Sequence, residues 1–403
     1  MTKRAAYLCL LCSLVGFGVS AAAAYTHYHL LHDPTYTSFC DVNQTVSCTQ
    51  VYMSRYSTFA GVPVAIFGAL WFVVAGLLSA AGLNARETVR ESVPGYLFVM
   101  STLALAVILY LGYASFFLLK AVCILCLTTY AAVIGLFIVS GAATSFPMTT
   151  LPRRLSRDLR VLVSSPLAIA IAILFFAGAA STLAFFPREG APAVAAATAG
   201  AAADTQAAQN QQSELERFMA TAPRVPLVVP AEGAKVLIVK FNDFECPACG
   251  QSYLQYKPIL QKYQASNPGA VRVVLKDYPL NPGCNPGIAQ VIHVSACDAA
   301  VAARLARKNN KSEAMEEWLY THQAGMTTAG VRQAARDVGG VTDFEGQYGS
   351  TVESIKADAA LGKQLAIKST PTFFINGVKV EGMWAPQFFD QAIAFELKRT
   401  ATK

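Results

Sequence analysis

Three pairs of cysteines in this chain are spaced so that they could carry out thiol and disulfide chemistry. They are Cys40 with Cys48, Cys123 with Cys126, and Cys246 with Cys249. Cys123 and Cys126 lie in the run K-A-V-C-I-L-C-L-T-T-Y, within an apolar stretch long enough to cross a bilayer. Residues three apart on a helix share a face, and their Cα atoms lie about 5 to 6 Å apart, which a disulfide tolerates. This pair is predicted to be a dithiol on a membrane helix.

Cys246 and Cys249 give the strongest local signal. Residues 235–242 predict a buried strand that leads directly into E-C-P-A-C-G, and residues 251–264 predict a helix. A helix N-terminus stabilises a thiolate, so Cys246 is predicted to be the exposed, attacking sulfur and Cys249 the shielded, resolving one. Pro247 suits the first helical turn. A structural disulfide or half a zinc site is disfavoured, because no second CxxC or His pair stands nearby.

Two further pairs are compatible with static disulfides. Cys40 and Cys48 lie in the polar segment F-C-D-V-N-Q-T-V-S-C, where a loop-closing disulfide and a shuttle pair are equally consistent with the residues. Cys284 and Cys297 flank a segment rich in Pro and Gly, N-P-G-C-N-P-G. There a stabilising disulfide is favoured over a further redox step.

Two other candidate sites are predicted to be inert. Cys9 and Cys12 also have CxxC spacing, but they lie about 6 to 10 Å from the inner end of the first apolar helix, far from the other pairs. Buried membrane cysteines behave as small apolar residues, so a structural role is favoured. For His27, His29 and His32, no carboxylate or cysteine completes a metal site at close spacing, and no metal is expected.

The composition indicates a membrane protein with a soluble part. Of the 403 residues, 54% are hydrophobic and 14% are charged, against roughly 25% charged in an ordinary soluble domain. The formal charge of +7 is spread out along the chain or falls where membrane topology would place it, which disfavours nucleic acid as a partner. Ten cysteines suit an oxidising compartment such as the periplasm.

Five apolar stretches are long enough to span a bilayer: residues 5–25, 61–83, 96–119, 121–143 and 165–186. Arginines concentrate in the second and fourth connections, which predicts a cytoplasmic N-terminus. Five crossings then place everything after residue 186 outside, on the same side as the Cys40 loop. Cys123 and Cys126 would lie within one or two turns of that outer face.

The remainder of the chain predicts a tether and a soluble α/β domain. Residues 188–212 are mostly Ala, Gln, Thr and Gly, so a linker is expected, placed at residues 188–230, with a reach on the order of 25 Å. Tethering at that reach corresponds to a millimolar effective concentration. Beyond it we expect a second strand, a helical block, and a hairpin that opens at Pro371 and turns at Asn376 and Gly377.

The soluble part resembles a known superfamily. F-N-D-F-E-C-P-A-C together with T-P-T-F-F-I-N-G looks like the thioredoxin superfamily, and the helical block between them looks like its DsbA-type branch, over residues 231–397. This resemblance implies that Cys246 is the nucleophile, Cys249 the resolving cysteine and Pro371 the cis-proline beside the site. The dipeptide between the cysteines is Pro-Ala, without the His of the most oxidising members.

The membrane part resembles the vitamin K epoxide reductase family over residues 5–143. The resemblance rests on Cys-Asp and Ser-Cys in the first loop, G-V-P-V-A-I-F-G opening the next helix, and C-I-L-C-L-T-T-Y-A. It implies that Cys40 receives electrons from the thioredoxin-like domain, that Cys48 passes them to Cys123, and that Cys126 faces a quinone. Tyr130 would hydrogen-bond that quinone. Val64 stands where vertebrate members have Asn, which favours ubiquinone or menaquinone over vitamin K epoxide.

The predicted fold class is a membrane all-α part, a four-helix bundle plus a fifth linking helix, fused to a soluble α/β thioredoxin-like domain with a helical insertion. Its segments are a vitamin K epoxide reductase-like membrane domain (1–143), a cytoplasmic connection with the fifth transmembrane helix (144–187), the linker (188–230) and a periplasmic DsbA/thioredoxin-like domain (231–403). The expected location is the cell inner membrane, with several crossings.

The predicted function is a membrane thiol:quinone oxidoreductase that drives disulfide formation in exported, reduced substrate proteins. Electrons would pass from the substrate to Cys246 and Cys249, then through the two other pairs to a quinone. A reductase of a vitamin K-like quinone or epoxide is the alternative enzyme. A membrane redox sensor is disfavoured, because the inside loops are short and lack an output element.

Overall fold

The computed structural model describes residues 1–33, 36, 38–42, 45–84, 87–185 and 212–401. The chain divides into two compact units. The first comprises Met1–Tyr28, Arg55–Phe116 and Val122–Ala197, and the second comprises His29–Ser54, Phe117–Ala121 and Thr198–Lys403. The segment with Cys40 and Cys48 therefore belongs to the same unit as the C-terminal domain.

Within the described residues, five helices are long and apolar enough to cross a membrane. They are α1 (Lys3–His32), α3 (Val64–Asn84), α4 (Glu87–Tyr113), which continues into a π-helical turn at Ala114–Leu118, α5 (Ile124–Ala143) and α7 (Pro166–Phe185). The predicted five membrane helices are confirmed. A short hairpin of β1 (Thr58–Phe59) and β2 (Val62–Pro63) precedes α3.

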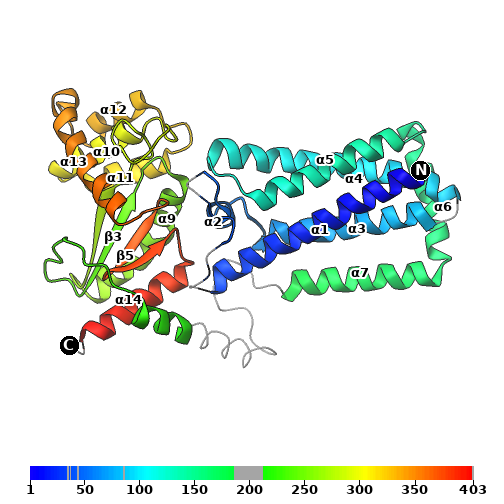
Figure 1. Ribbon diagram of the computed structural model, residues 1–403, viewed down its shortest axis with the longest axis horizontal. Helices are drawn as coiled ribbons and strands as arrows, with labels where there is room; N and C mark the ends of the chain where they lie inside the picture. Colours follow the sequence, from blue (N-terminus) through cyan, green and yellow to red (C-terminus); the bar gives the residue numbers. More distant parts are fainter. Residues whose placement is uncertain (34–35, 37, 43–44, 85–86, 186–211, 402–403) are drawn as a thin grey trace. The chain divides into compact units, whose positions relative to one another are not determined.

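Four of these helices form a bundle. Figure 1 shows α1, α3, α4 and α5 running alongside one another, and α4 packs against both α3 and α5. The bundle core is apolar and includes Cys9, Phe72, Leu97 and Leu136. No residue in the apolar window of α7 (Pro166–Ala184) is buried, so this helix flanks the bundle as the predicted fifth helix.

A charged amphipathic helix, α6 (Leu151–Val163), connects α5 to α7 after a 3-10 turn at Met148–Thr150. It is fixed to α4 by polar contacts: Tyr96 donates a hydrogen bond to Asp158 at 2.8 Å, and Arg157 donates to the Thr88 carbonyl at 2.8 Å. The arginines of the fourth connection, which predicted that this connection is cytoplasmic, all lie in this helix.

The second unit contains a four-stranded sheet with the order β4-β3-β5-β6. Its strands are β3 (Val236–Asn242), β4 (Val271–Asp277), β5 (Thr372–Ile375) and β6 (Val378–Glu381). β3 pairs in parallel with β4 and antiparallel with β5. Asn376 and Gly377 form the predicted hairpin turn, with φ of 45° and 87°, a conformation that glycine and asparagine tolerate best.

Helices surround this sheet. α9 (Pro247–Ser266) follows β3, and α14 (Pro386–Ala401) closes the domain. The insertion comprises α10 (Ala296–Lys308), α11 (Ser312–Thr321), α12 (Thr328–Asp337) and α13 (Phe344–Gln364). In Figure 1 these four helices gather at one end of the sheet, and α14 lies on the opposite side. The α/β class with a helical insertion is confirmed.

One packed element lies within the predicted linker. Residues 188–211 fall outside the described part of the chain, but residues 212–221 are helical. Leu215 and Met219 of this helix are fully buried against the sheet and α14. Just beyond it, Arg224 donates hydrogen bonds to the buried Glu396 at 2.7 Å and to the Asn376 carbonyl at 3.0 Å. The residues from 212 onward therefore belong to the folded unit.

Candidate active site

The CxxC motif forms the turn between β3 and α9. Cys246 is the N-cap residue of α9, with extended backbone (φ −73°, ψ 120°), and Pro247 occupies the first turn. The amide of Cys249 donates to the Cys246 carbonyl at 3.0 Å. The Gln323 side chain donates to the carbonyls of Phe244 and Cys246, both at 2.8 Å. The turn is thus held by hydrogen bonds from its own helix and from the region after α11.

Both sulfurs of the motif are buried. Cys246 is 2% exposed and Cys249 is fully buried, and they share an apolar cluster with Phe244 and Met383. In its protonated form the Cys246 thiol donates to the Thr370 carbonyl at 3.3 Å, and the Cys249 sulfur accepts from the Asp243 amide at 3.5 Å. The expected exposure of Cys246 is wrong, because its side chain packs into this cluster and its sulfur is directed at Thr370.

The two thiols differ in acidity. A hydrogen bond from the Cys249 thiol, assisted by the positive charge of His293 and opposed by burial and by the negative charge of Asp243, lowers the pKa of Cys246 to about 6. Burial, together with the neighbouring Cys246 thiolate, raises the pKa of Cys249 well above its ordinary value. At neutral pH, Cys246 is therefore mainly a thiolate, the form that attacks disulfides, and Cys249 stays protonated.

Pro371 lies beside this pair. The Thr370–Pro371 peptide bond is cis, and it directly precedes β5. The Thr370 carbonyl, which accepts from the Cys246 thiol, is therefore the carbonyl of this cis peptide group. The side chain of Thr372, the first residue of β5, donates back to the Ser369 carbonyl at 2.7 Å.

Sequence reasoning missed a buried lysine next to Cys249. Lys240 on β3 is 5% exposed, and its ammonium donates to the Cys249 carbonyl at 3.2 Å and to the Tyr320 hydroxyl at 3.4 Å. Burial lowers the pKa of Lys240. The signal was present in K-V-L-I-V-K-F-N, where a charged residue interrupts an otherwise apolar strand.

Cys40 and Cys48 form a disulfide with a Cα–Cα distance of 5.6 Å. Cys48 begins the short helix α2 (Cys48–Tyr52), whose N-cap is Ser47. The Asp41 carboxylate orders the segment, because it accepts from the Ser47 hydroxyl at 2.8 Å and from the amide and hydroxyl of Thr49. The Ser38 hydroxyl lies 3.2 Å from the Cys40 sulfur.

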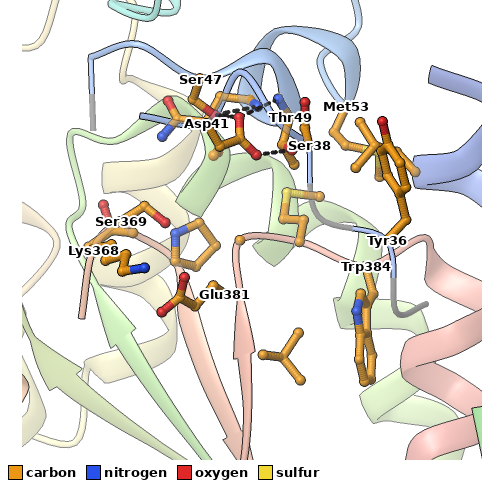
Figure 2. Close-up of a pocket in the computed structure, with 18 of the residues that line it drawn as sticks. Tyr36, Ser38, Asp41, Ser47, Thr49, Met53, Lys368, Ser369, Glu381 and Trp384 are labelled. Atoms are coloured by element: carbon orange, nitrogen blue, oxygen red, sulfur yellow. Dashed lines mark hydrogen bonds between the residues drawn. The ribbon is translucent and has the colours of Figure 1, made fainter. Parts of the chain in front are cut away.

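A cavity of about 520 Å³ separates this segment from the CxxC side of the sheet domain, inside the second unit. Figure 2 shows Ser38, Asp41, Ser47 and Thr49 on one wall, with Lys368, Ser369, Glu381 and Trp384 across from them. Ala248, Thr370 and Pro371 also line the cavity. The cavity therefore lies between residues next to Cys40 and residues next to Cys246.

The structure refines the position of Cys123. It is the N-cap residue of α5, with extended backbone (φ −101°, ψ 121°), so the helix begins three residues later than predicted from residue 121. The Cys126 amide donates to the Cys123 sulfur at 3.3 Å. Tyr130 follows one turn further along α5 and packs beside Gly112, where an added Cβ would lie 3.8 Å from its ring.

The remaining four cysteines lie in the membrane bundle and in the sheet domain. Cys9 lies inside α1, fully buried in the bundle core, and Cys12 on the same helix packs near Gly135 of α5. Cys284 and Cys297 form a disulfide with a Cα–Cα distance of 5.8 Å. Among the described residues, no group of three or more His, Cys, Asp or Glu side chains could hold a metal ion.

Sequence reasoning also missed a buried pair next to the motif. The Asp243 carboxylate lies 2.8 Å from the Nδ1 atom of His293. The two residues are 50 positions apart, and no local pattern connects them.

Two family models match this chain. Residues 7–141 match the vitamin K epoxide reductase family, and residues 225–394 match thioredoxin. The vitamin K epoxide reductase complex subunit 1 of Mus musculus is 31% identical over 141 residues, which is 32% of this chain and 83% of the mouse protein.

Other similarities cover single parts of the chain. The Na(+)/H(+) antiporter NhaA 1 of Mycobacterium sp. (strain KMS) is 24% identical over 156 residues, and the chain spans 23% of that protein's length. The solved structure of Wolbachia pipientis alpha-DsbA1 matches 44% of this chain and 96% of its own, at 17% identity and a TM-score of 0.37. From the identity to the mouse protein over most of its length, the chain belongs to the vitamin K epoxide reductase family, and it carries a thioredoxin-like domain at its C-terminal end.

Proposed function

We propose that this oxidoreductase is a membrane protein-dithiol:quinone oxidoreductase that forms disulfides in exported proteins. A substrate dithiol reduces the Cys246–Cys249 disulfide, and the two electrons then pass to the Cys40–Cys48 disulfide. Cys123 and Cys126 receive them next, and a quinone takes two electrons and two protons to become a hydroquinone. Every protein step is attack by a thiolate through a mixed disulfide.

The observation that carries this proposal is the position of the Cys40 segment inside the second unit. Gln251, two residues after Cys249 on α9, donates a hydrogen bond to the Met53 carbonyl just beyond α2. An added Cβ at Gly382, after β6, would lie 3.8 Å from the Thr49 side chain. Both contacts bring α2 against the elements that frame the CxxC motif, which supports exchange between the two pairs.

The exchange starts with Cys246 and Cys249 reduced by the substrate and with Cys40 and Cys48 joined as a disulfide, a pairing that their Cα–Cα distance of 5.6 Å accommodates. The Cys246 thiolate attacks Cys40, a new S–S bond forms, and Cys48 leaves as a thiolate. Cys249 then attacks Cys246, which releases Cys40 as a thiolate and leaves the motif oxidised.

The last transfer is assigned to α5. Cys48 attacks the Cys123–Cys126 disulfide at Cys123, and Cys126 leaves as a thiolate. Cys40 then attacks Cys48, which releases Cys123 and restores the Cys40–Cys48 disulfide. The reduced Cys123 and Cys126 pair gives two electrons and two protons to the quinone, which Cys126 faces. Tyr130 lies one turn from Cys126 on the same helix, where a hydroxyl can hydrogen-bond a quinone oxygen. The N-terminus is cytoplasmic and the second unit faces the periplasm, as the positions of the arginines favour.

The relay is tested with purified protein in nanodiscs that contain ubiquinone or menaquinone, supplied with a reduced peptide dithiol. Peptide oxidation over many turnovers should stop in Cys126→Ala and continue in the matched control Cys12→Ala. Undiminished oxidation in Cys126→Ala would show that electrons bypass this pair.

The order within the first loop is tested by trapping. A Cys249→Ala variant cannot resolve the mixed disulfide, so Cys246 should remain bonded to its partner, and peptide mass spectrometry identifies that partner. Capture of Cys40 supports the order given above. Capture of Cys48 reverses the two roles.

The mouse relative is named for reduction of vitamin K epoxide. A second candidate function is therefore reduction of a vitamin K-like quinone or epoxide by the same relay, with the reduced quinone as the useful product. Val64, the first residue of α3, is apolar where the resemblance predicts an Asn in vertebrate members, so one quinone donor is missing. Turnover should therefore be faster with ubiquinone or menaquinone than with vitamin K epoxide. The reverse preference would favour the second candidate.

A further inference from the structure

The loop between β4 and α10 is closed by the Cys284–Cys297 disulfide and carries a buried histidine. His293 is 2% exposed. Its amide donates to the Leu280 carbonyl at 3.1 Å, and its carbonyl accepts from the Asn281 side chain at 2.9 Å. The backbone on both sides of the imidazole is thus fixed to the residues that follow β4.

The histidine side chain is bound to the CxxC turn through Asp243. The carboxylate of Asp243 is fully buried; it lies 2.8 Å from the His293 Nδ1 atom and accepts from the amides of Glu245 and Leu280 at 2.8 and 2.7 Å. The carbonyl of Asp243 accepts from the Cys246 amide at 3.2 Å. One residue therefore connects the loop to both ends of the motif's turn.

The charges facing His293 favour its protonated form. Burial opposes the imidazolium, but the Asp243 carboxylate, with Cys246 and Glu245 nearby, outweighs burial and raises the pKa of His293. Glu245 is partly neutralised by other groups, because it accepts from the Ser295 amide at 2.6 Å and pairs with Lys120 at 2.7 Å. A buried cation beside a thiol favours the thiolate.

We propose that His293 is a positioning residue of the dithiol site, held against Asp243 by the disulfide-closed loop. Its imidazolium stabilises the Cys246 thiolate, in a motif that has no histidine between its two cysteines. The proposal rests on the proposed function only in taking Cys246 as the attacking and leaving sulfur. When a substrate thiolate resolves its mixed disulfide with Cys246, the S–S bond breaks and Cys246 departs with the electron pair. A stabilised thiolate departs faster and makes the motif more oxidising.

The test is the pH profile of Cys246 alkylation in the full-length, reduced protein. Iodoacetamide labelling is followed by mass spectrometry, and fragment ions separate Cys246 from Cys249 in one peptide. In His293→Gln, which keeps a donor for Asp243, labelling at pH 6 should slow roughly fivefold to tenfold. The exposed His322 provides the control, and His322→Gln should keep the original profile. An unchanged profile in folded His293→Gln overturns the proposal.

A second variant separates the positioning role of the loop from its contribution to folding. Replacing both Cys284 and Cys297 by Ala releases the loop, so the profile should move in the same direction as in His293→Gln. Adding His293→Gln to that variant should cause little further change, because both act through the same imidazolium. Fully additive changes would show that the disulfide does not act through His293. Labelling needs no quinone or substrate protein, so its failure leaves the relay standing, and failure of the relay leaves this result standing.

Discussion

Two CxxC pairs with identical spacing differ in where they lie on their helices: Cys9 and Cys12 lie inside a helix, whereas Cys246 and Cys249 lie at a helix start. Cys9 and Cys12 lie well inside α1, where the backbone amides are already paired within the helix. Cys246 is the N-cap residue of α9, at a helix end whose amides lack helical partners. Cys123 occupies the same N-cap position on α5, and its sulfur accepts from the Cys126 amide.

In the proposed relay, CxxC spacing alone does not make a redox pair. The first cysteine must coincide with the helix N-terminus, where amides and the helix dipole stabilise a thiolate. Two of the three CxxC motifs satisfy this condition, and each of them belongs to a different one of the two units. This criterion separates the pairs more directly than depth in the membrane does.

The largest expected effect separates the N-cap pair from the helix-interior pair. Cys246→Ala should abolish oxidation of a reduced peptide dithiol, because no attacking sulfur remains. Cys9→Ala removes only a small buried side chain and should leave the rate within about twofold of the original. The assay follows loss of peptide thiols with Ellman's reagent. A large loss of rate in folded Cys9→Ala would break the comparison.

The second effect distinguishes the two N-cap pairs from each other. Cys123→Ala should stop multiple turnover with a quinone but leave a burst of about two equivalents of oxidised peptide, because the Cys246–Cys249 and Cys40–Cys48 disulfides each still accept two electrons. Quenched-flow measurement of peptide oxidation resolves the burst from the steady state. Steady turnover in this variant would mean that α5 lies outside the electron path.

A third effect sharpens the contrast between exchanging pairs and a static one. Removing the Cys284–Cys297 disulfide, whose cysteines are 13 residues apart, should destabilise the domain. A loop of this length corresponds to about 3 kcal/mol of unfolding free energy. Urea unfolding of the double Ala variant measures it. An unchanged midpoint would indicate that the loop is held by its hydrogen bonds alone.

The smallest effect is a pH dependence. The lowered pKa of Cys246, about 6, predicts that its alkylation is constant above pH 7 and falls about tenfold per pH unit below pH 6, as the thiolate becomes protonated. Cys9 lies in the apolar core of the membrane bundle, which a water-soluble reagent does not enter, and should not react at any of these pH values. Labelling at pH values from 4.5 to 8.5 tests both statements. A midpoint near the ordinary thiol value would contradict the first.

Much of the architecture follows from local patterns in the sequence. Apolar length predicts the membrane helices, and an apolar strand, CxxC and a helix in succession predict the thioredoxin-like site. Asn-Gly predicts the hairpin turn. Each of these signals lies within one short stretch of the sequence, so it can be recognised without knowing which distant residues come into contact.

The parts that escaped prediction depend on helix starts and on distant contacts. Apolar periodicity does not mark where α5 begins, although Lys120, at a positive φ of 50°, interrupts the chain shortly before it. Leu215 and Met219 are buried by a sheet and a helix far along the chain. The Asp243–His293 pair joins residues 50 positions apart through a loop that contains no regular element.

The central claim is that Cys40, Cys48, Cys123, Cys126, Cys246 and Cys249 exchange electrons and that the remaining cysteines do not. Differential alkylation during turnover, read by mass spectrometry at each cysteine, tests it in one measurement. When the quinone is withheld and peptide dithiol is present, these three pairs should all become reduced, and adding the quinone should reoxidise them. Cys9 and Cys12 should remain thiols and Cys284–Cys297 a disulfide throughout. A change at Cys9 and Cys12, or none at Cys123 and Cys126, would contradict the account.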